Sequence, residues 1–527
     1  MAPRRMTLLF VACVGLFTAC VPIIEPVRGL EHCPTPDGII DFADGALAAA
    51  IQEQLGLESP AITCQALARL RTLRARSAGI TRLDGLEYAV NVTQLDLRGN
   101  AISDVGPIGH LPRLRRLDLL GNQMSDLSSL RILPAITQLE LRRNQVSDLT
   151  PLADLTTLRH LDLRDNAIED ITALAALDGL RHLALQNNQI SSVRALAGLT
   201  QLQFLALDGN LISDGGPLGQ LVALETLSMR GNQLEDTSFL FLLTNVETLD
   251  LRSNAITELP GLRGLSNLTS LQLGRNQITE IDHLAGVVAL ERLDLERNAI
   301  ISIAALSELT GLTDLDLSRN LITDTTPLQR LTALETLDLS RNQIDDITPL
   351  ARLTNLTTLD LSRNQIDDIT PLARLTNLTT LDLANNTIPD LEALRNTTPL
   401  QNLNVSTNDI TDTTPLARLN NLTTLDLSRN QITDTTPLQR LTALETLDLS
   451  RNQIDDITPL ARLTNLTTLD LARNVVRDVE VLRQLEALTS VDLDRNCLPE
   501  ALEDSAALRT LAARGVEINV GAQAACD

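Results

Sequence analysis

The stretch Leu356-Thr-Thr-Leu359-Asp-Leu361-Ser-Arg-Asn364-Gln-Ile366-Asp-Asp-Ile369-Thr-Pro-Leu372 contains the pattern that decides the fold. The same arrangement of aliphatic residues around an asparagine recurs every 22 residues, without an insertion, from Asn100 to Asn496. A degenerate copy precedes this series and carries Ala78 in place of the asparagine. We therefore expect about 20 copies of one structural unit, stacked into an elongated array.

Each unit contains one strand and one return segment. The Leu-x-Leu part alternates apolar and polar residues, which is typical of a short strand with one buried face. Strands that recur at a fixed interval stack in parallel, and a crossover joins each strand to the next. The crossover often reads Thr-Pro-Leu, as at 348–350 and 458–460, where Thr can cap and Pro can begin a single helical turn. We expect the asparagine amide to bind buried backbone groups where the chain turns inward.

The repeat is identified as a leucine-rich repeat, and its consensus resembles the internalin-type repeat of bacterial surface proteins. The stretch Ile40-Asp-Phe-Ala-Asp44 and the later stretch 80–88, which ends Gly-Leu-Glu-Tyr, are similar to the helical cap of that family. The resemblance covers about residues 38–496 and departs afterwards, where internalins typically continue into an immunoglobulin-like module. It implies an α/β solenoid with a curved parallel sheet on the concave face and short helical turns and loops on the convex face. It also implies adhesion or partner binding through the concave sheet, without identifying the receptor.

The chain divides into five predicted segments. An amphipathic helix is expected within the N-terminal cap, from Asp44 to Leu55. The segments are a lipoprotein signal peptide at 1–19, a linker at 20–37, an N-terminal helical cap at 38–69, the repeat array at 70–496 and a C-terminal cap at 497–527.

The N-terminus has the features of an export signal. Two arginines precede an apolar run at 6–17, which is shorter than the roughly 20 residues that span a bilayer. The sequence Thr18-Ala19-Cys20 resembles a bacterial lipoprotein cleavage box, which implies that Cys20 carries a lipid. Val21 then implies an outer-membrane or cell-surface destination in the bacterial envelope. The alternative is an ordinary secretory signal in which Cys20 has no role.

Four cysteines remain after the leader, two at each end of the array: Cys33, Cys64, Cys497 and Cys526. Exported chains can keep disulfides, and pairing across the array would join opposite ends of an elongated molecule. We therefore predict the pairs Cys33–Cys64 and Cys497–Cys526. Four unpaired thiols are the alternative. A zinc site is less favoured, since His32 is the only histidine near these cysteines.

Composition excludes several classes of function. The net charge is −24, which disfavours nucleic acid and anionic bilayers. The five histidines show no metal-ligand spacing, and no nucleophile motif or phosphate-binding loop occurs. We therefore predict neither an enzyme nor a bound metal or cofactor. Asp lies four residues before the asparagine in 13 of the 19 repeats, which indicates a stripe for a cationic partner or Ca²⁺, or a consensus residue that neighbouring Arg neutralises.

One place on the predicted concave face departs from the repeat consensus. Six residues before the asparagine, three successive repeats carry His160, His182 and Phe204, where Thr, Ser or Gln is usual. Beside them the Asp stripe is interrupted, and Arg side chains would form a rim. Exposed aromatic groups in a patch of low charge are typical of binding sites, although drift in a tolerant surface is the alternative. The other predicted partner-binding residues are Ala184, Ala206, Ser228, Arg142, Arg164 and Arg230.

These features predict a monomeric cell-surface lipoprotein that binds a protein partner. The alternative is an architectural spacer without a specific ligand. Residues 322–361 recur identically at 432–471, and identical units present identical surfaces. Specific recognition is therefore expected in the diversified repeats, at about 94–300.

Overall fold

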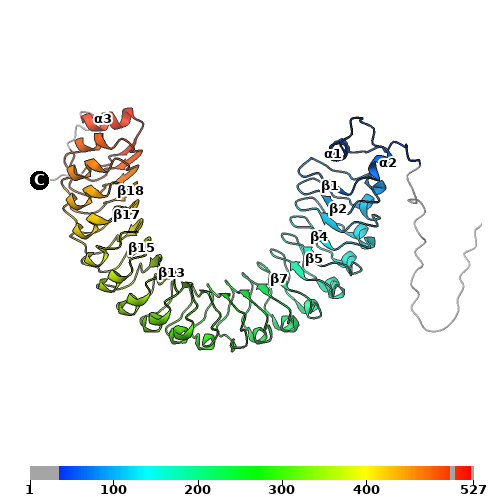
Figure 1. Cartoon of the computed structure of the whole chain (residues 1–527), viewed down its shortest axis with the longest axis horizontal. Coiled ribbons are helices and arrows are strands. Elements are labelled where there is room, and N and C mark those ends of the chain that lie inside the picture. The colour runs from blue at the N-terminus through cyan, green and yellow to red at the C-terminus, as the bar shows by residue number, and fades with distance from the viewer. Residues whose placement is uncertain (1–34, 499–504, 524–527) are drawn as a thin grey trace, which may run out of the picture.

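The computed structural model describes residues 35–498 and 505–523. The chain forms an open arc in which one strand of each repeat lies on the inner side and the helical turns lie on the outer side (Figure 1). This arrangement confirms the predicted leucine-rich repeat solenoid. The inner side of the arc is the concave face that the sequence predicts.

One parallel sheet runs through the whole arc, and every strand of it has three residues. Each strand pairs only with its neighbours along the chain, and paired residues lie 22 positions apart up to β20. The strands are β1 Thr72–Arg74, β2 Gln94–Asp96, β3 Arg116–Asp118, β4 Gln138–Glu140, β5 His160–Asp162, β6 His182–Ala184, β7 Phe204–Ala206, β8 Thr226–Ser228, β9 Thr248–Asp250, β10 Ser270–Gln272, β11 Arg292–Asp294, β12 Asp314–Asp316, β13 Thr336–Asp338, β14 Thr358–Asp360, β15 Thr380–Asp382, β16 Asn402–Asn404, β17 Thr424–Asp426, β18 Thr446–Asp448, β19 Thr468–Asp470, β20 Ser490–Asp492 and β21 Glu517–Asn519.

Short 3₁₀ helices occupy the return segments. Pro stands in the first turn of many of them, as predicted for Thr-Pro-Leu. They are η1 Leu86–Tyr88, η2 Gly106–Ile108, η3 Ser128–Ile132, η4 Thr150–Leu152, η5 Thr172–Ala176, η6 Arg194–Leu196, η7 Gly216–Gln220, η8 Ser238–Leu242, η9 Asp282–Leu284, η10 Ala304–Glu308, η11 Thr326–Arg330, η12 Thr348–Arg352, η13 Thr370–Arg374, η14 Glu392–Leu394, η15 Thr414–Arg418, η16 Thr436–Arg440, η17 Thr458–Arg462 and η18 Glu480–Gln484.

The core is a continuous column of aliphatic side chains between the strands and the return segments. Leu337 at the centre of β13 and Leu339 just after it are fully buried, as is Ile344 after the turn. The same positions are buried in the other repeats. Leu, Ile and Val therefore supply almost all of the hydrophobic stabilisation, which agrees with the low aromatic content.

The repeated asparagines join each repeat to the one before it. The Asn342 side chain accepts a hydrogen bond from the Ile322 backbone N–H at 3.0 Å. It donates to the carbonyl oxygens of Leu317 and Leu339, both at 3.0 Å. Two of these three partners belong to the preceding repeat. The predicted role of the asparagine in satisfying buried backbone is confirmed.

The residue before each asparagine adopts a left-handed backbone conformation. At Arg341 φ is 56°, and the same region is occupied by Gly99 and Gly209 in other repeats. Glycine enters this region without strain, whereas a residue with a Cβ loses roughly 1 kcal/mol or more. Ten repeats nevertheless carry Arg there, so the repeat fold tolerates a side chain at this bend.

Helix α1, Gly45–Leu55, covers the first repeat and begins where the sequence predicts. The Asp44 side chain accepts hydrogen bonds from the Ala46 and Leu47 N–H groups at 2.9 and 3.1 Å. Its other oxygen accepts from the Thr81 N–H at 2.8 Å, which fixes the helix to the array. Burial acts to raise the pKa of Asp44, but the hydrogen bonds to both carboxylate oxygens outweigh this effect and lower that pKa.

A second short helix, α2 Cys64–Leu67, follows α1, and Cys64 is buried there. Cys33, Cys526, Cys20 and the predicted signal peptide lie outside the described residues. The two disulfide pairs and the lipidated cysteine therefore stay predictions.

The segment predicted as a C-terminal cap contains a helix and a strand that the sequence pattern did not specify. Helix α3, Ala506–Ala513, lies beside the last 3₁₀ helix, and β21 pairs with β20. Gln523 then takes the place of the next asparagine. Its side-chain oxygen accepts from the Leu498 N–H at 3.2 Å, and its side-chain nitrogen donates to the Leu493 carbonyl at 3.1 Å.

Candidate functional site

Three rows of side chains line the concave face. The first row lies at the start of each strand and includes Thr72, Gln94, Arg116, Gln138, His160, His182 and Phe204. The second row lies at the end of each strand and contains most of the repeated Asp residues. The third row follows two residues later and contains residues such as Arg98, Arg142 and Asp208.

The strand register brings the three predicted rings into one stack. The His160 and His182 ring centroids lie 4.1 Å apart with planes 10° apart. His182 and Phe204 are also 4.1 Å apart, with planes within 4°. We call these three residues the ring stack. All three side chains are partly buried rather than fully exposed, so each ring is held in place by its neighbour.

The environment sets the charge of the ring stack. His160 Nε2 lies 2.9 Å from Glu140 Oε1. Burial acts to raise the pKa of Glu140, but hydrogen bonds from His160 and Gln138 outweigh it and lower that pKa. Burial, and then the charge of His160, lower the pKa of His182 to about 4. His182 is therefore neutral at pH 7 and can pack against an apolar group.

Small residues lie beside the ring stack in the second row. Ala184 and Ala206 are buried although they face the concave side, so larger neighbours cover them. Ser228, the third residue of this interruption, donates a hydrogen bond to Asp208 Oδ1, which also accepts from the Arg230 N–H at 2.8 Å. Asp208 thus places a carboxylate beside a patch that the sequence predicts to be free of carboxylates.

The predicted arginine rim lines one shallow depression next to the ring stack. Arg142, Arg164 and Arg230 of the third row line it, together with Ser228 of the second row and Asp165, around a volume of about 310 Å³. Arg142 pairs with Asp165 at 2.8 Å, and Arg164 pairs with Asp162. Two of the three predicted rim charges are therefore neutralised within the chain.

The sequence prediction did not include Asp165 and Asp208, because it considered only the arginines of the third row. Both lie close to the asparagine of their repeat, at fixed offsets of one and two residues. A survey of the third row and of the residue after it would have found them.

The second row forms a line of partly buried carboxylates. Burial, reinforced by the charges of Asp360 and Asp316, raises the pKa of Asp338 to about 6. Burial likewise raises the pKa of Asp470 to about 6. Arg98, Arg164 and Arg252 pair with second-row carboxylates of their own repeats. The arginines just before the asparagines form no ion pair with this row within 35–498. Neighbouring Arg therefore neutralises only part of the Asp stripe among the described residues.

The described residues contain neither a metal-binding cluster nor a membrane-spanning helix. Within 35–498 and 505–523, no group of three or more His, Cys, Asp or Glu side chains is arranged to hold a metal ion. No helix in the same ranges has the length and apolar content needed to cross a bilayer.

Comparison with known proteins agrees with this geometry. The sequence matches the family described as Leucine Rich repeats (2 copies) at 90–132, 112–154, 134–176, 244–286, 332–374 and 420–462. Further leucine rich repeat matches cover 156–212, 266–322, 442–498 and 374–390. The chain belongs to the leucine-rich repeat proteins. No curated protein matches it significantly.

Solved structures share the fold. The ectodomain of the Arabidopsis thaliana receptor kinase GASSHO1/SCHENGEN3, in complex with CASPARIAN STRIP INTEGRITY FACTOR 2, has a TM-score of 0.70 and 23% identity, over 88% of this chain. This chain covers 60% of the length of that ectodomain. A leucine-rich repeat protein of Leptospira interrogans has a TM-score of 0.62 and 27% identity, over 75% of this chain and 97% of its own. An internalin of Listeria monocytogenes is 27% identical over 83% of this chain and 98% of its own, with a TM-score of 0.35.

Proposed function

We propose that this protein is a cell-surface lipoprotein of bacteria that binds a protein partner through its concave face, centred on the ring stack. The observation that supports it best is the stack itself. The neutral imidazole of His182 lies between the imidazole of His160, which pairs with Glu140, and the phenyl ring of Phe204. The three rings are in contact on a face that is otherwise polar. Preordered aromatic groups lose little entropy on binding and are typical interface anchors.

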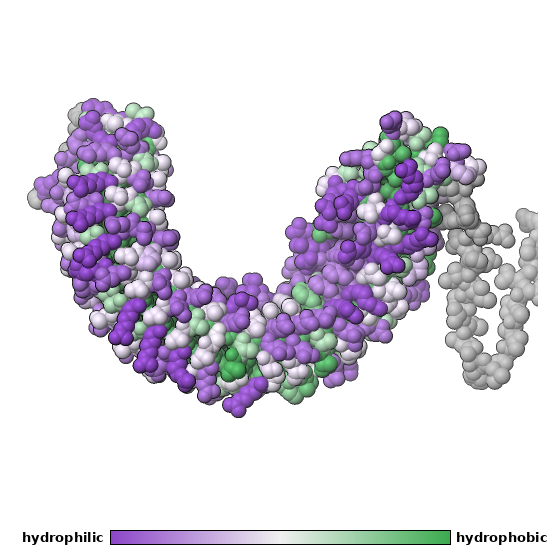
Figure 2. All heavy atoms as spheres, in the orientation of Figure 1, coloured by the Kyte–Doolittle hydropathy of each residue, from purple (hydrophilic) through white to green (hydrophobic). Residues whose placement is uncertain are grey.

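The surface around the ring stack suits a protein partner better than a small molecule. The adjoining depression is shallow and lined by charged side chains, whereas small-molecule pockets are mostly apolar and enclosed. The visible surface is mostly hydrophilic, with small apolar areas near the middle of the arc (Figure 2). Receptor ectodomains with the same fold were solved in complex with CASPARIAN STRIP INTEGRITY FACTOR 2 and, for the Arabidopsis receptor kinase HAESA, with the peptide hormone IDA and the co-receptor SERK1, which supports a role in peptide or protein recognition.

Replacement of Phe204 by Ala is expected to weaken partner binding about 30-fold, because roughly 2 kcal/mol of contact energy is lost from a central anchor. The partner would be isolated with the chain from residue 21 onward and titrated calorimetrically. Phe204 is partly buried against His182, so the variant is also expected to unfold slightly earlier, and circular dichroism must show that it is folded. The control is Thr358→Ala, at the same row position on β14. Equal weakening by both substitutions would contradict the proposal.

Replacement of Cys20 by Ser is expected to release the protein from the membrane, because the proposed anchor is a lipid on that cysteine. Cells that express either form would be fractionated with detergent, and the chain located by immunoblot. The parent should enter the detergent phase and the variant the aqueous phase. Retention of the variant in the detergent phase would show that another segment anchors the chain.

A spacer without a ligand is the second candidate function. It is favoured by the identical blocks 322–361 and 432–471, because duplication adds length without a new surface. Under this alternative, the chain from residue 21 onward would bind no protein partner.

A further inference from the structure

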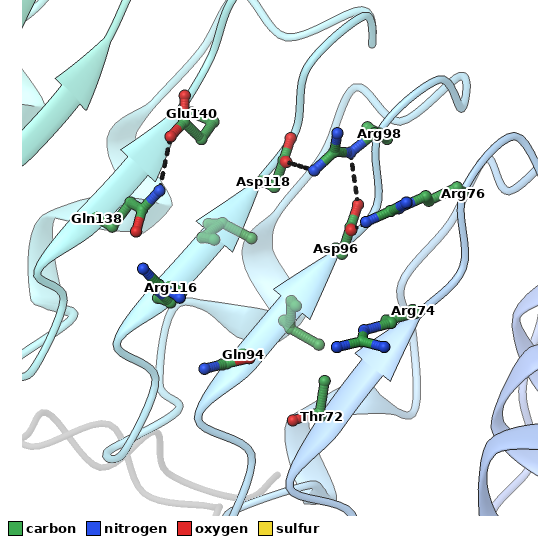
Figure 3. Close-up of a pocket in the computed structure, with 12 residues that line it drawn as sticks. Thr72, Arg74, Arg76, Gln94, Asp96, Arg98, Arg116, Asp118, Gln138 and Glu140 are labelled. Atoms are coloured by element: carbon green, nitrogen blue, oxygen red, sulfur yellow. Dashed lines mark hydrogen bonds and ion pairs between the residues drawn. The ribbon is translucent and has the colours of Figure 1, made fainter.

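A second depression lies on the concave face at the N-terminal end of the arc, between β1 and β4 (Figure 3). We call it the N-terminal depression. Its volume is about 190 Å³, which is smaller than the roughly 300–1,000 Å³ of small-molecule pockets. It is lined mainly by first-row and second-row side chains and is rich in arginine. Its size suits one or two side chains of a larger molecule.

Most of the carboxylates in the N-terminal depression are already paired. Arg98 bridges Asp96 at 2.9 Å and Asp118 at 2.6 Å, and Arg76 reaches Asp96 at 2.6 Å. Burial raises the pKa of Asp118. These contacts use the charges of Arg76 and Arg98 within the protein.

Two arginines in the N-terminal depression have no such partner. The side chains of Arg74 on β1 and Arg116 on β3 are exposed and make no hydrogen bond or ion pair within the described ranges. Gln94 lies on β2, between these two strands, and its side-chain amide makes no hydrogen bond within the described ranges. Guanidinium groups form their strongest hydrogen bonds with carboxylates. The three side chains are therefore donors that face open space.

The surrounding sequence reinforces this charge. Residues 69–143 contain 12 Arg and seven Asp or Glu, although the whole chain has a net charge of −24. A positive end on an acidic molecule attracts anionic groups locally while the rest of the surface repels them.

We propose that the N-terminal depression binds a short acidic segment of the protein partner, whose carboxylates contact Arg74 and Arg116. The proposal rests on the proposed function, since it assigns a chemistry to the same partner. Four strands span about 14 Å, which matches about four extended residues. A longer polyanion along the concave face would meet the carboxylates of Glu140 and the Asp row. The acidic segment must therefore be short.

The first row connects the two sites. It leads from Arg116 and Gln138 directly to His160 and the ring stack. A partner that follows this row would place acidic residues in the N-terminal depression and apolar or aromatic residues over the rings. This order identifies the kind of sequence that the partner should contain.

The test uses a fluorescently labelled tetra-glutamate peptide and the chain from residue 21 onward, at low ionic strength. Fluorescence anisotropy should show binding that weakens about fivefold in Arg74→Gln and in Arg116→Gln, and about 20-fold or more in the double variant. Both residues are exposed, so the variants should fold normally, which their circular dichroism checks. The control is Arg292→Gln. Arg292 starts β11 in the first row, as Arg116 starts β3, and it lies beside Asp294 and Asp314. This variant should bind tetra-glutamate as the parent does.

Three results would overturn the proposal: no binding of tetra-glutamate, equal weakening by Arg292→Gln, or equal binding of tetra-lysine. Affinity that keeps rising in proportion to length, for a 12-residue poly-glutamate or for dextran sulfate, would also overturn it, because a long polyanion would then be the ligand. Failure here leaves the proposed function standing, since the probe contains no apolar group and the ring stack is tested separately by Phe204→Ala with the isolated partner.

Discussion

Replacement of Asn342 by Ala is expected to destabilise the repeats around it by about 3 kcal/mol or more. The substitution leaves the buried Ile322 N–H without its acceptor. The carbonyls of Leu317 and Leu339 each lose one of two amide donors and keep only Asn320 and Asn364. An unsatisfied buried polar group costs roughly 1–3 kcal/mol, and no water can reach the interior of the turn without disrupting the packing. The loss is therefore larger than that of an ordinary surface hydrogen bond.

The measurement is urea unfolding together with hydrogen exchange of the Ile322 amide. Solenoids lose stability locally, so the exchange rate at Ile322 should rise more than rates near either end. Asn355→Ala is the matched control. Asn355 belongs to the same repeat, but it is exposed and makes a single hydrogen bond, to the Thr332 carbonyl at 2.9 Å. If both variants unfolded at the same urea concentration, the role assigned to the buried asparagines would be wrong.

The stability of the array is expected to fall as the pH rises from about 4 to 6.5. In the folded chain, burial raises the pKa of seven second-row carboxylates above their ordinary value of 3.8: Asp118, Asp294, Asp316, Asp338, Asp382, Asp448 and Asp470. Such groups bind protons more tightly when folded. Their stabilising effect is complete below 3.8 and is lost as the pH rises through the folded pKa, about 6 for Asp338 and Asp470.

Other groups shift in the opposite direction. The lowered pKa of His182, about 4, favours folding at higher pH, but only one such group was found among the described histidines. Convex carboxylates such as Asp346 have pKa values lowered by hydrogen bonds from Thr348, and their effect is lost only below about pH 4. The seven second-row carboxylates outweigh His182 between about pH 4 and 6.5, so the stability of the array falls over that range.

The double variant Asp338→Asn, Asp470→Asn should melt at a higher temperature than the parent at pH 8 and at about the same temperature at pH 4.5. The chain itself contains a precedent. Asn404 occupies this row, accepts from the Ser406 N–H at 3.1 Å and donates to Asp382 at 3.0 Å. Asp346→Asn, on the convex face, should bring no gain at pH 8. A parent chain that melts at the same temperature from pH 4 to 6.5 would refute this account.

Sequence periodicity predicted the features that depend on spacing alone. The asparagine hydrogen bonds and the alignment of His160, His182 and Phe204 follow from the register of 22-residue units. What spacing cannot supply is the direction of a long side chain. Arg98 turns toward two carboxylates whereas Arg74 and Arg116 do not, although the three residues belong to successive repeats. The N-terminal depression and the pairing of Arg142 with Asp165 could therefore not be predicted.

In each repeat, two backbone groups form hydrogen bonds with the asparagine of the following repeat. Every repeat therefore depends on the one that comes after it in the chain. Ala78 can replace an asparagine because no earlier repeat depends on it. At the other end, Gln523 binds the Leu498 N–H and the Leu493 carbonyl, which belong to the repeat of Asn496. A block of whole repeats can therefore be copied into the middle, as 322–361 and 432–471 show, and both junctions remain satisfied. Duplication can therefore lengthen the arc. During synthesis, however, the last repeat made lacks the hydrogen bonds from a following side chain until Gln523 has been added.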